Sequence, residues 1–353
     1  MSKLKVFLSI LLIVVLLALM GGGLYLFSNK QFADEEKDGT GDKTYIVLGD
    51  SIAEALMGPR PLTEMVNYGY YGVLGQRNGY IYYNQAVSGA TSEDCLKFLQ
   101  KDADRGVNLE YSRLREADII QLSILGNDFL LSDLNDLFFS LANDDYERID
   151  SIVESSTITF SQIIDTIKEA NPNALLLVQT VYNPYHEGCK IVGPELIERL
   201  RDELGEEYIE VPKLRELANK LITKLNGIIY KYHEENPDDF VLVDVYTHFN
   251  EIYEKDNDLG ARLILIDSVH PSSHGHAVIA DLTQELLEKE NYVKSPEFAV
   301  EKYKKIRVDQ LDRLYRGTTV NIAKAKSEIL RAKTCSEVTS AYFDAIYGVD
   351  PII

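Results

Sequence analysis

The chain has 353 residues, of which 45% are hydrophobic, which is enough for one sizeable core with appendages and excludes a disordered chain. Its 56 acidic residues outnumber its 36 basic residues, giving a formal net charge of -20 at pH 7. Because nucleic acids are bound through a surplus of lysine and arginine, this charge argues against a nucleic-acid partner.

The N-terminus carries a long apolar segment. Lys3 and Lys5 precede an uncharged run over residues 6–27, whose 22 residues match the length of a membrane-spanning helix. Lysines on the N-terminal side predict that this end stays in the cytoplasm and that the rest of the chain lies outside. The run is longer than the core of a typical signal peptide and has no clear cleavage site. We therefore expect residues 1–27 to form an uncleaved signal anchor in the cell membrane, with cleavage and secretion as the alternative.

A polar linker over residues 28–43 leads into a body in which short apolar runs alternate with longer amphipathic ones. Strands are expected at residues 44–49, 80–87, 118–124, 174–180 and 240–245. Helices are expected between them, for example at residues 91–104, 146–170 and 211–235. This alternation predicts a parallel sheet covered by helices on both faces.

The last part of the chain changes character. Residues 293–353 show helical patterns around 308–315, 321–333 and 337–347 and carry no recognisable chemistry. We interpret them as a helical extension that packs on the body, with a separate small module as the alternative.

The three cysteines, Cys95, Cys189 and Cys335, are widely spaced and form no C-x-x-C pair. This spacing indicates neither a zinc site nor a disulfide framework. We expect three unpaired and mostly buried thiols, although one disulfide outside the cell remains open.

Polar residues and a glycine stand in four loops that follow predicted strands or precede a helix. The first strand ends in GDS, which presents Ser51, and the loops after the second and third strands contain Gly89 and Asn127. After the fifth strand, Asp267 and His270 stand three residues apart in IDSVHP. Gly, Asp and Ser are common turn formers, so GDS alone indicates nothing more than a turn. In an open parallel sheet, however, the loops at the carboxyl ends of the strands converge, so these residues are expected to meet.

Each residue type suits one task in acyl transfer. Ser51 would attack an acyl carbon, His270 would accept and return its proton, and Asp267 would orient the imidazole. The backbone N–H groups of Ser51 and Gly89 and the side-chain amide of Asn127 would form an oxyanion hole.

The blocks GDS, NQAVSGAT, GND and DSVHP together resemble those of the GDSL or SGNH hydrolases. The resemblance covers about residues 44–290, and we place the hydrolase domain at residues 44–292. The resemblance implies a flavodoxin-like three-layer α/β/α fold with about five parallel strands, and ester hydrolysis without metal or cofactor. It implies that Ser51, Asp267 and His270 are catalytic and that Gly89 and Asn127 complete the oxyanion hole. The chain departs from the family pattern at IAEA after the serine, and at Leu125, where the third block usually has a glycine.

Other residues are open to two interpretations. His274 and His276 follow His270, and we favour solvent-facing or capping histidines over metal ligands, since no further ligands complete a site. His186 and Asn183 follow the fourth strand and either touch substrate or form a plain turn.

Six of the 22 tyrosines lie between Ser51 and Gly89. Tyr68, Tyr70 and Tyr71 are candidates for contact with a sugar or acyl ligand, with ordinary packing as the alternative.

The sequence thus predicts a membrane-anchored, extracytoplasmic serine esterase or lipase that acts on O-acyl esters of lipids or envelope glycans through an acyl-enzyme. An O-acyltransferase that passes the acyl group to a glycan hydroxyl is the nearest alternative. A non-catalytic envelope binding module with this fold is the second.

Overall fold

The structure, a computed structural model, describes residues 42–56, 68–105 and 109–347. The expected anchor over residues 1–27 and nearly all of the linker lie outside these residues. Within the described part of the chain, no helix is both long and apolar enough to cross a membrane.

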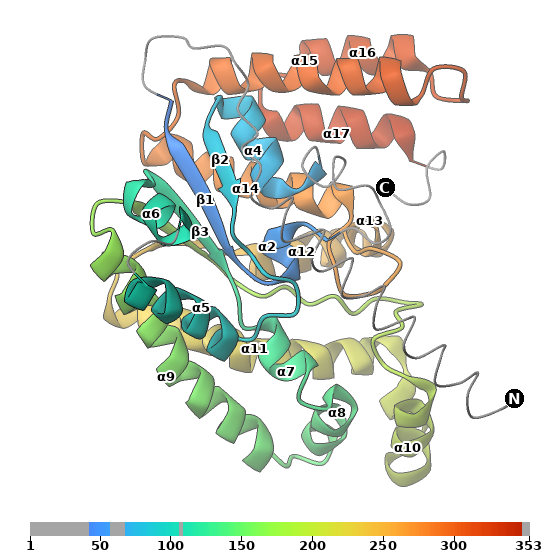
Figure 1. Ribbon diagram of the computed structural model, residues 1–353. Coiled ribbons are helices and arrows are strands. Elements are labelled where there is room, and N and C mark those ends of the chain that lie inside the picture. Colours follow the sequence, from blue (N-terminus) through green and yellow to red (C-terminus); the bar gives the residue numbers. More distant parts are fainter. Residues whose placement is uncertain (1–41, 57–67, 106–108, 348–353) are drawn as a thin grey trace, which may run out of the picture.

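A five-stranded sheet forms the centre of the molecule (Figure 1). Its strands are all parallel and lie in the order β2-β1-β3-β4-β5. The bounds are Thr44–Gly49 for β1, Ile81–Asn84 for β2, Ile119–Ser123 for β3, Leu175–Gln179 for β4 and Val241–Val243 for β5. The predicted parallel sheet of about five strands is confirmed, and most strands are shorter than the apolar runs that predicted them.

Both faces of the sheet are buried. In β1, Tyr45 and Val47 point into one core while Ile46 and Leu48 point into the other, as the two-residue period of a strand requires. A strand buried on both faces is apolar without alternation, which explains the continuous run in the sequence.

One core lies between the sheet and the helices that connect the middle strands, most of which Figure 1 shows below the sheet. They are α5 (Ser92–Arg105), α6 (Leu109–Glu116), α7 (Gly126–Leu130), α8 (Leu134–Ala142), α9 (Glu147–Ala170), α10 (Pro194–Leu204), the 3-10 helix η1 (Glu206–Ile209) and α11 (Val211–Glu235). The remaining helices of the body are α2 (Ser51–Glu54), α4 (Tyr70–Asn78), α12 (Val245–Lys255), α13 (Asn257–Arg262) and α14 (Ser273–Lys289).

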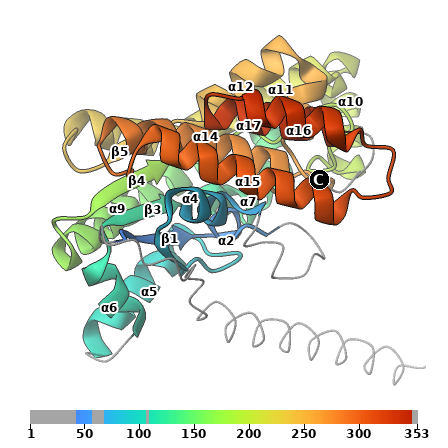
Figure 2. The same ribbon diagram turned by 90° about the horizontal axis from the view of Figure 1, so that it is seen from above.

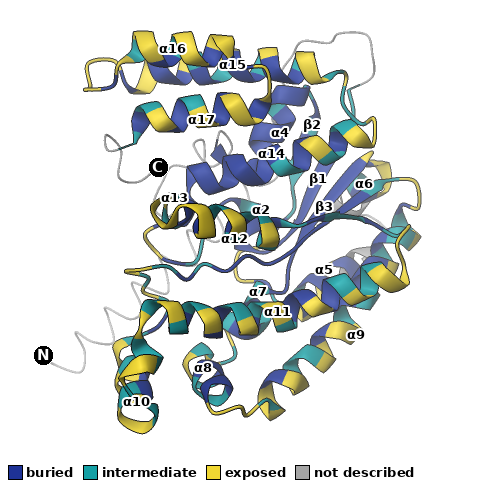
Figure 3. Cartoon of the chain, turned by 180° about the vertical axis from the view of Figure 1, so that it is seen from behind, coloured by how far each residue is buried: buried dark blue, intermediate teal, exposed yellow. Residues whose placement is uncertain are grey.

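The C-terminal helices cover the opposite side of the molecule. They are α15 (Pro296–Leu314), α16 (Ile322–Arg331) and α17 (Cys335–Ile346), so the first begins at residue 296 rather than near 308. Figures 1 and 2 show α15 and α17 beside α4 and α14, with which they are in contact. Helix α14 therefore has the sheet on one side and the C-terminal helices on the other, and it is buried along most of its length (Figure 3).

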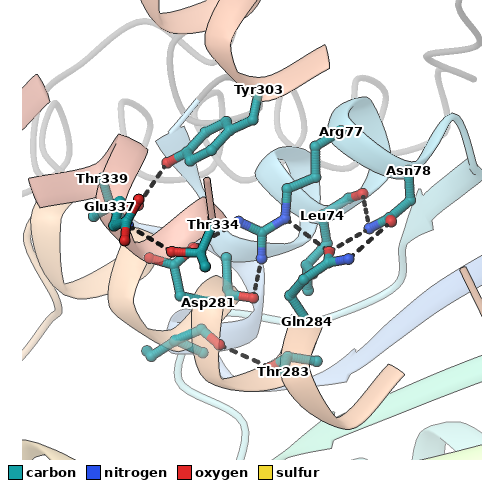
Figure 4. Close-up of polar contacts among 12 residues, drawn as sticks. Leu74, Arg77, Asn78, Asp281, Thr283, Gln284, Tyr303, Thr334, Glu337 and Thr339 are labelled. Carbon is teal, nitrogen blue, oxygen red and sulfur yellow. Dashed lines mark hydrogen bonds and ion pairs between the residues drawn. The ribbon is translucent and has the colours of Figure 1, made fainter. Parts of the chain in front are cut away.

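Polar contacts run through this interface (Figure 4). Arg77 of α4 is fully buried; its Nη1 donates to an Asp281 carboxylate oxygen of α14 at 2.6 Å, and its Nε donates to Gln284 Oε1 at 2.9 Å. The ring of Tyr303 from α15 lies 5.2 Å from the Arg77 guanidinium carbon, and its hydroxyl lies 3.1 Å from Thr339 Oγ1 of α17. Because breaking a buried ion pair strands a charge, these contacts hold the four helices in one arrangement.

All three cysteines are free, as expected. Cys95 and Cys335 are buried, and Cys189 is half-buried.

Candidate active site

Ser51 stands at a sharp turn from β1 into α2. Gly49 has a φ of 132°, and a Cβ on it would lie 1.8 Å from the Ser123 carbonyl oxygen of the neighbouring strand β3. Glycine is thus required by both conformation and space. Asp50 then caps α2 by accepting the backbone N–H of Ile52 at 2.9 Å. The chain leaves the strand at Gly49 and enters α2 after the Asp50 cap, so Ser51 is the first residue of this helix.

Asp267 and His270 form a compact turn. One carboxylate oxygen of Asp267 accepts the backbone N–H groups of Val269 and His270, each at 3.0 Å. The other oxygen lies 2.7 Å from His270 Nδ1. His270 Nε2 in turn lies 2.8 Å from Ser51 Oγ. The structure therefore places the three residues in one hydrogen-bonded chain.

The charge of Asp267 follows from its contacts. Burial raises the pKa of this carboxyl, but hydrogen bonds from the His270 side chain and from the backbone N–H groups of Val269 and His270 outweigh it and leave the pKa below its usual value. Asp267 is thus an ionised hydrogen-bond acceptor at neutral pH and fixes which imidazole nitrogen carries the proton.

The turn is tied to its surroundings. The backbone N–H of Leu265 donates to the His270 carbonyl at 2.8 Å, and the Tyr182 hydroxyl donates to the Val269 carbonyl at 2.5 Å. The histidine is therefore held by its backbone as well as by its side chain.

Asn127 lies on α7 and is 6% exposed. Its Nδ2 donates to the Ala90 carbonyl at 2.9 Å, and its second N–H has no acceptor among residues 42–56, 68–105 and 109–347. The backbone N–H groups of Ser51 and Gly89 likewise have no acceptor in this part of the chain. Gly89 lies in an exposed loop just before Ala90. These three donors remain free to bind an oxyanion.

Asp128 is a residue that the sequence did not single out. Its carboxylate accepts the Ser92 backbone N–H at 3.0 Å, the Ser92 hydroxyl at 2.5 Å and the Ser156 hydroxyl at 2.8 Å. It thereby joins the start of α5, just after the Gly89 loop, to the helix that carries Asn127. The only sequence feature that could have drawn attention to Asp128 is its position directly after Asn127 in GND.

Leu125, which stands where the third block of the family usually has a glycine, adopts a backbone conformation typical of glycine. Its φ is 90°, in the region that favours glycine, and its side chain is fully buried. Leucine thus adopts the backbone conformation for which the usual glycine is suited, and Asn127 keeps its place two residues later.

Two further carboxyl groups lie close to Ser51. Burial raises the pKa of Asp50 to about 7, even though the Ile52 backbone N–H donates to it. Burial also raises the pKa of Glu54, against hydrogen bonds from Ser88. Both carboxyl groups are therefore harder to ionise than exposed ones.

A small pocket of about 70 Å³ opens beside Ser51 and Asn127, and its walls come from α7, α8, α11 and the segment after β4. A larger groove of about 750 Å³ runs along the opposite side of α11 and is lined by residues that include Arg215, Lys220 and Lys224. The larger groove contains none of Ser51, His270 and Asp267, so the small pocket is the one that belongs to the site.

The expectation for His274 and His276 was wrong. His274 is 6% exposed and stacks on Phe343 of α17 at 4.4 Å, while His276 is fully buried and stacks on Tyr70 at 5.9 Å. Burial lowers the pKa of each to about 3. Neither faces solvent, because Phe343 of α17 covers His274 and Tyr70 of α4 covers His276.

The three tyrosines that were candidates for ligand contact are packing residues. Tyr68, Tyr70 and Tyr71 are all buried in the core between the sheet and the C-terminal helices, and none lines the small pocket. Substrate contact through them is not supported.

In the segment after β4, Asn183 forms a turn and also lines the small pocket, so the two alternatives for this residue, a turn or substrate contact, are compatible. The Asn183 side-chain oxygen accepts the Tyr185 N–H at 2.9 Å, which is a turn contact, and Asn183 also lines the small pocket. His186 Nδ1 lies 2.9 Å from the Pro184 carbonyl oxygen and does not line the pocket.

Within the residues that the structure describes, no group of three or more His, Cys, Asp or Glu side chains is arranged to hold a metal ion.

Comparisons with known proteins show which family matches this chain. The family model for GDSL-like lipase/acylhydrolase matches residues 45–283. YpmR of Bacillus subtilis (strain 168), an uncharacterized protein, is 24% identical over 212 residues, which cover 60% of this chain and 68% of that protein.

Solved structures also match this chain. A lipase from a goat rumen metagenome has 18% identity and a TM-score of 0.47, and the match covers 69% of this chain and 96% of that one. Phospholipase A1 from Streptomyces albidoflavus has 16% identity and a TM-score of 0.48, with 69% and 99% covered.

Proposed function

Because the chain belongs to the GDSL-like lipase/acylhydrolase family, we propose that it is a serine esterase that cleaves O-acyl esters through an acyl-enzyme on Ser51. The observation that carries the proposal is the hydrogen-bonded chain from Ser51 Oγ through His270 to Asp267, with distances of 2.8 Å and 2.7 Å. The three unused N–H donors of Ser51, Gly89 and Asn127 support it.

In the first half-reaction, Ser51 Oγ bonds to the ester carbonyl carbon while His270 Nε2 accepts the serine proton. The carbonyl oxygen takes up the negative charge and accepts hydrogen bonds from the three donors. The intermediate then collapses, the ester C–O bond breaks, and the alcohol leaves with the proton from His270. Asp267 stays ionised and stabilises the imidazolium that forms.

In the second half-reaction, a water molecule attacks the acyl carbon and gives its proton to His270. The bond to Ser51 Oγ breaks, the serine recovers its proton from His270, and a carboxylic acid is released. Atoms and charges balance without a metal or cofactor.

The proposal places this domain outside the cytoplasm, tethered by residues 1–27. The length of the apolar run and the lysines before it support this arrangement. Proteolysis of intact cells tests it: the domain is expected to be digested without lysis, and a protected domain would contradict it.

Turnover of p-nitrophenyl esters tests the chemistry. His270→Gln and Asp267→Asn are each expected to lower kcat about 10⁴-fold, because each removes one member of the proton-transfer chain. His248→Gln is the matched control, since His248 lies on α12 and outside this chain of contacts, and its kcat is expected to stay unchanged. Wild-type protein without ester turnover, or a His270→Gln variant with normal kcat, would overturn the proposal.

A further inference from the structure

The small pocket beside Ser51 reaches only one side of the reacting centre. Ser51 and Asn127 line it, whereas His270, Asp267 and Gly89 do not. The pocket is therefore adjacent to the nucleophile and to one oxyanion donor but away from the proton donor.

This asymmetry decides which half of an ester the pocket receives. The leaving alcohol takes its proton from His270 Nε2, so the alcohol oxygen must lie toward His270. The acyl chain extends from the other side of the carbonyl carbon. A pocket that Asn127 lines and His270 does not is thus on the acyl side.

The lining is suited to a hydrocarbon chain. Most of it is apolar, for example Phe129, Leu134, Phe138, Leu221 and Ile222. The polar side chains in the wall, besides those of Ser51 and Asn127, are Asp50, Tyr182, Asn183 and Tyr185. Asp50 accepts the Ile52 backbone N–H, Asn183 Nδ2 donates to Asn219 Oδ1 at 2.8 Å, and the Tyr182 hydroxyl donates to the Val269 carbonyl. Because the rest of the wall is apolar, a sugar entering here would replace few of its hydrogen bonds to water.

The volume limits the length of that chain. A water-sized group needs roughly 10–15 Å³ of such space, so 70 Å³ accommodates about five to seven carbon-sized groups. The carbonyl carbon, which is bonded to Ser51 in the acyl-enzyme, adds one carbon to this number. We propose that this pocket binds the acyl chain of the substrate and selects straight chains of about six to eight carbons over acetyl and over long fatty acyl groups. The inference rests on the proposed esterase function and adds the substrate class to it.

Helix α11 offers a matched pair of variants. Ile222 lines the acyl pocket, whereas the next residue, Thr223, is exposed and lines the large groove on the other side of the helix. Ile222→Trp fills the pocket, and Thr223→Trp adds a large side chain on the face that the pocket does not share. A second pair enlarges rather than fills: Phe138 lines the pocket, and its neighbour Leu137 is fully buried outside it.

The experiment measures kcat/KM for p-nitrophenyl acetate, butyrate, hexanoate, octanoate and palmitate. For the wild type we expect a rise of about fourfold per added methylene up to hexanoate or octanoate, then a fall, because burying each methylene contributes a fixed transfer free energy until the pocket is full. Ile222→Trp should move the optimum to acetate or butyrate, and Phe138→Ala should move it to longer chains. Thr223→Trp and Leu137→Ala should keep the wild-type optimum.

The outcomes separate this inference from the proposed function. An optimum at acetate or palmitate, or an Ile222→Trp profile identical to the wild type, overturns the pocket assignment while ester turnover still stands. Absence of turnover on every ester overturns both. Labelling of each variant by a small fluorophosphonate shows that it is folded. If Ile222→Trp neither labels nor unfolds cooperatively, Ile222→Phe replaces it, and the same shift toward short chains is expected.

Discussion

Asn127 donates one of its two side-chain N–H groups to the Ala90 carbonyl oxygen at 2.9 Å. This contact links α7 to the end of the Gly89 loop, so it holds together two of the three groups that we propose as oxyanion donors. A donor that is in place before substrate binds is the kind that is effective in a transition state.

Removing this donor has a specific kinetic effect. Asn127→Ala is expected to lower kcat by about 10² to 10³ with little change in KM, because the lost hydrogen bond matters mainly in the transition state. The variant should still react with a fluorophosphonate, only more slowly. Steady-state kinetics check this, and a wild-type kcat would show that Asn127 does not contact the reacting oxygen.

Leu125 allows a test of backbone strain. Its φ of 90° favours glycine, while its fully buried side chain favours leucine. Both Leu125→Ala and Leu125→Gly lose packing worth about 2–5 kcal/mol, but only glycine relieves the strain, by about 1 kcal/mol. Leu125→Gly should therefore be at least as stable as Leu125→Ala in urea denaturation.

Leu122 is the control for this comparison. It is fully buried in strand β3, where glycine has no conformational advantage. There the glycine variant should be less stable than the alanine variant. The same order of stabilities at both positions would contradict the interpretation of Leu125.

Asp50 makes stability depend on pH. Its folded-state pKa of about 7 lies above the ordinary value of 3.8, so the folded protein binds this proton more tightly than the unfolded chain does. The stability associated with the neutral carboxyl is fully present below about pH 4 and is lost as the pH rises toward 7. Asp50→Asn keeps a side-chain oxygen for the Ile52 N–H but cannot ionise.

The difference in Tm between Asp50→Asn and the wild type should therefore be small at pH 4, grow as the pH rises to 7, and stay constant above it. Each pKa unit corresponds to about 1.4 kcal/mol, so the gain should be readily measurable. Thermal unfolding at pH 4, 6 and 8 checks it. A difference that shrinks with rising pH would show that the buried carboxyl is stabilised in its charged form.

The C-terminal helices cannot be removed without exposing the body. His274 and Phe343, which stack on each other, and buried residues of α4 lie in one core with the C-terminal helices. A chain spanning residues 43–292 is expected to lose cooperative unfolding and to aggregate, whereas a chain spanning residues 43–347 should fold. Near-ultraviolet circular dichroism and gel filtration distinguish them, and a monomeric, cooperatively unfolding 43–292 chain would show that the extension is a separate module.

The sequence predicted the parallel sheet and the clustering of Ser51, Asp267 and His270, because both depend on local signals, while the catalytic roles of these residues stay predictions. A parallel strand that is buried on both faces is apolar throughout, so it can be recognised as a continuous apolar run. The end of β1 can be recognised by Gly49, because only glycine fits beside β3 at that position. The family blocks then named the residues that the carboxyl edge of the sheet brings together. The structural role of Asp128 could not be predicted, because its hydrogen-bond partners, Ser92 and Ser156, lie on two other helices.

Burial that depends on distant segments was not predictable in this way. His274 and His276 carry no local sign of burial, because the residues that cover them, Phe343 of α17 and Tyr70 of α4, are distant in the sequence. The small pocket is assembled from α7, α8, α11 and the segment after β4, and no short motif encodes its volume. Such features depend on how whole elements pack.

The central claim is that Ser51 is the nucleophile, and covalent labelling tests it most directly. Protein treated with a fluorophosphonate is digested and the modified peptide is located by mass spectrometry, with Ser51→Ala and Ser92→Ala compared in parallel; Ser92 is the control because its hydroxyl is held by Asp128. We predict one adduct, on Ser51, that disappears together with ester turnover in Ser51→Ala and remains in Ser92→Ala. An adduct on another residue, or wild-type turnover in Ser51→Ala, would contradict the account.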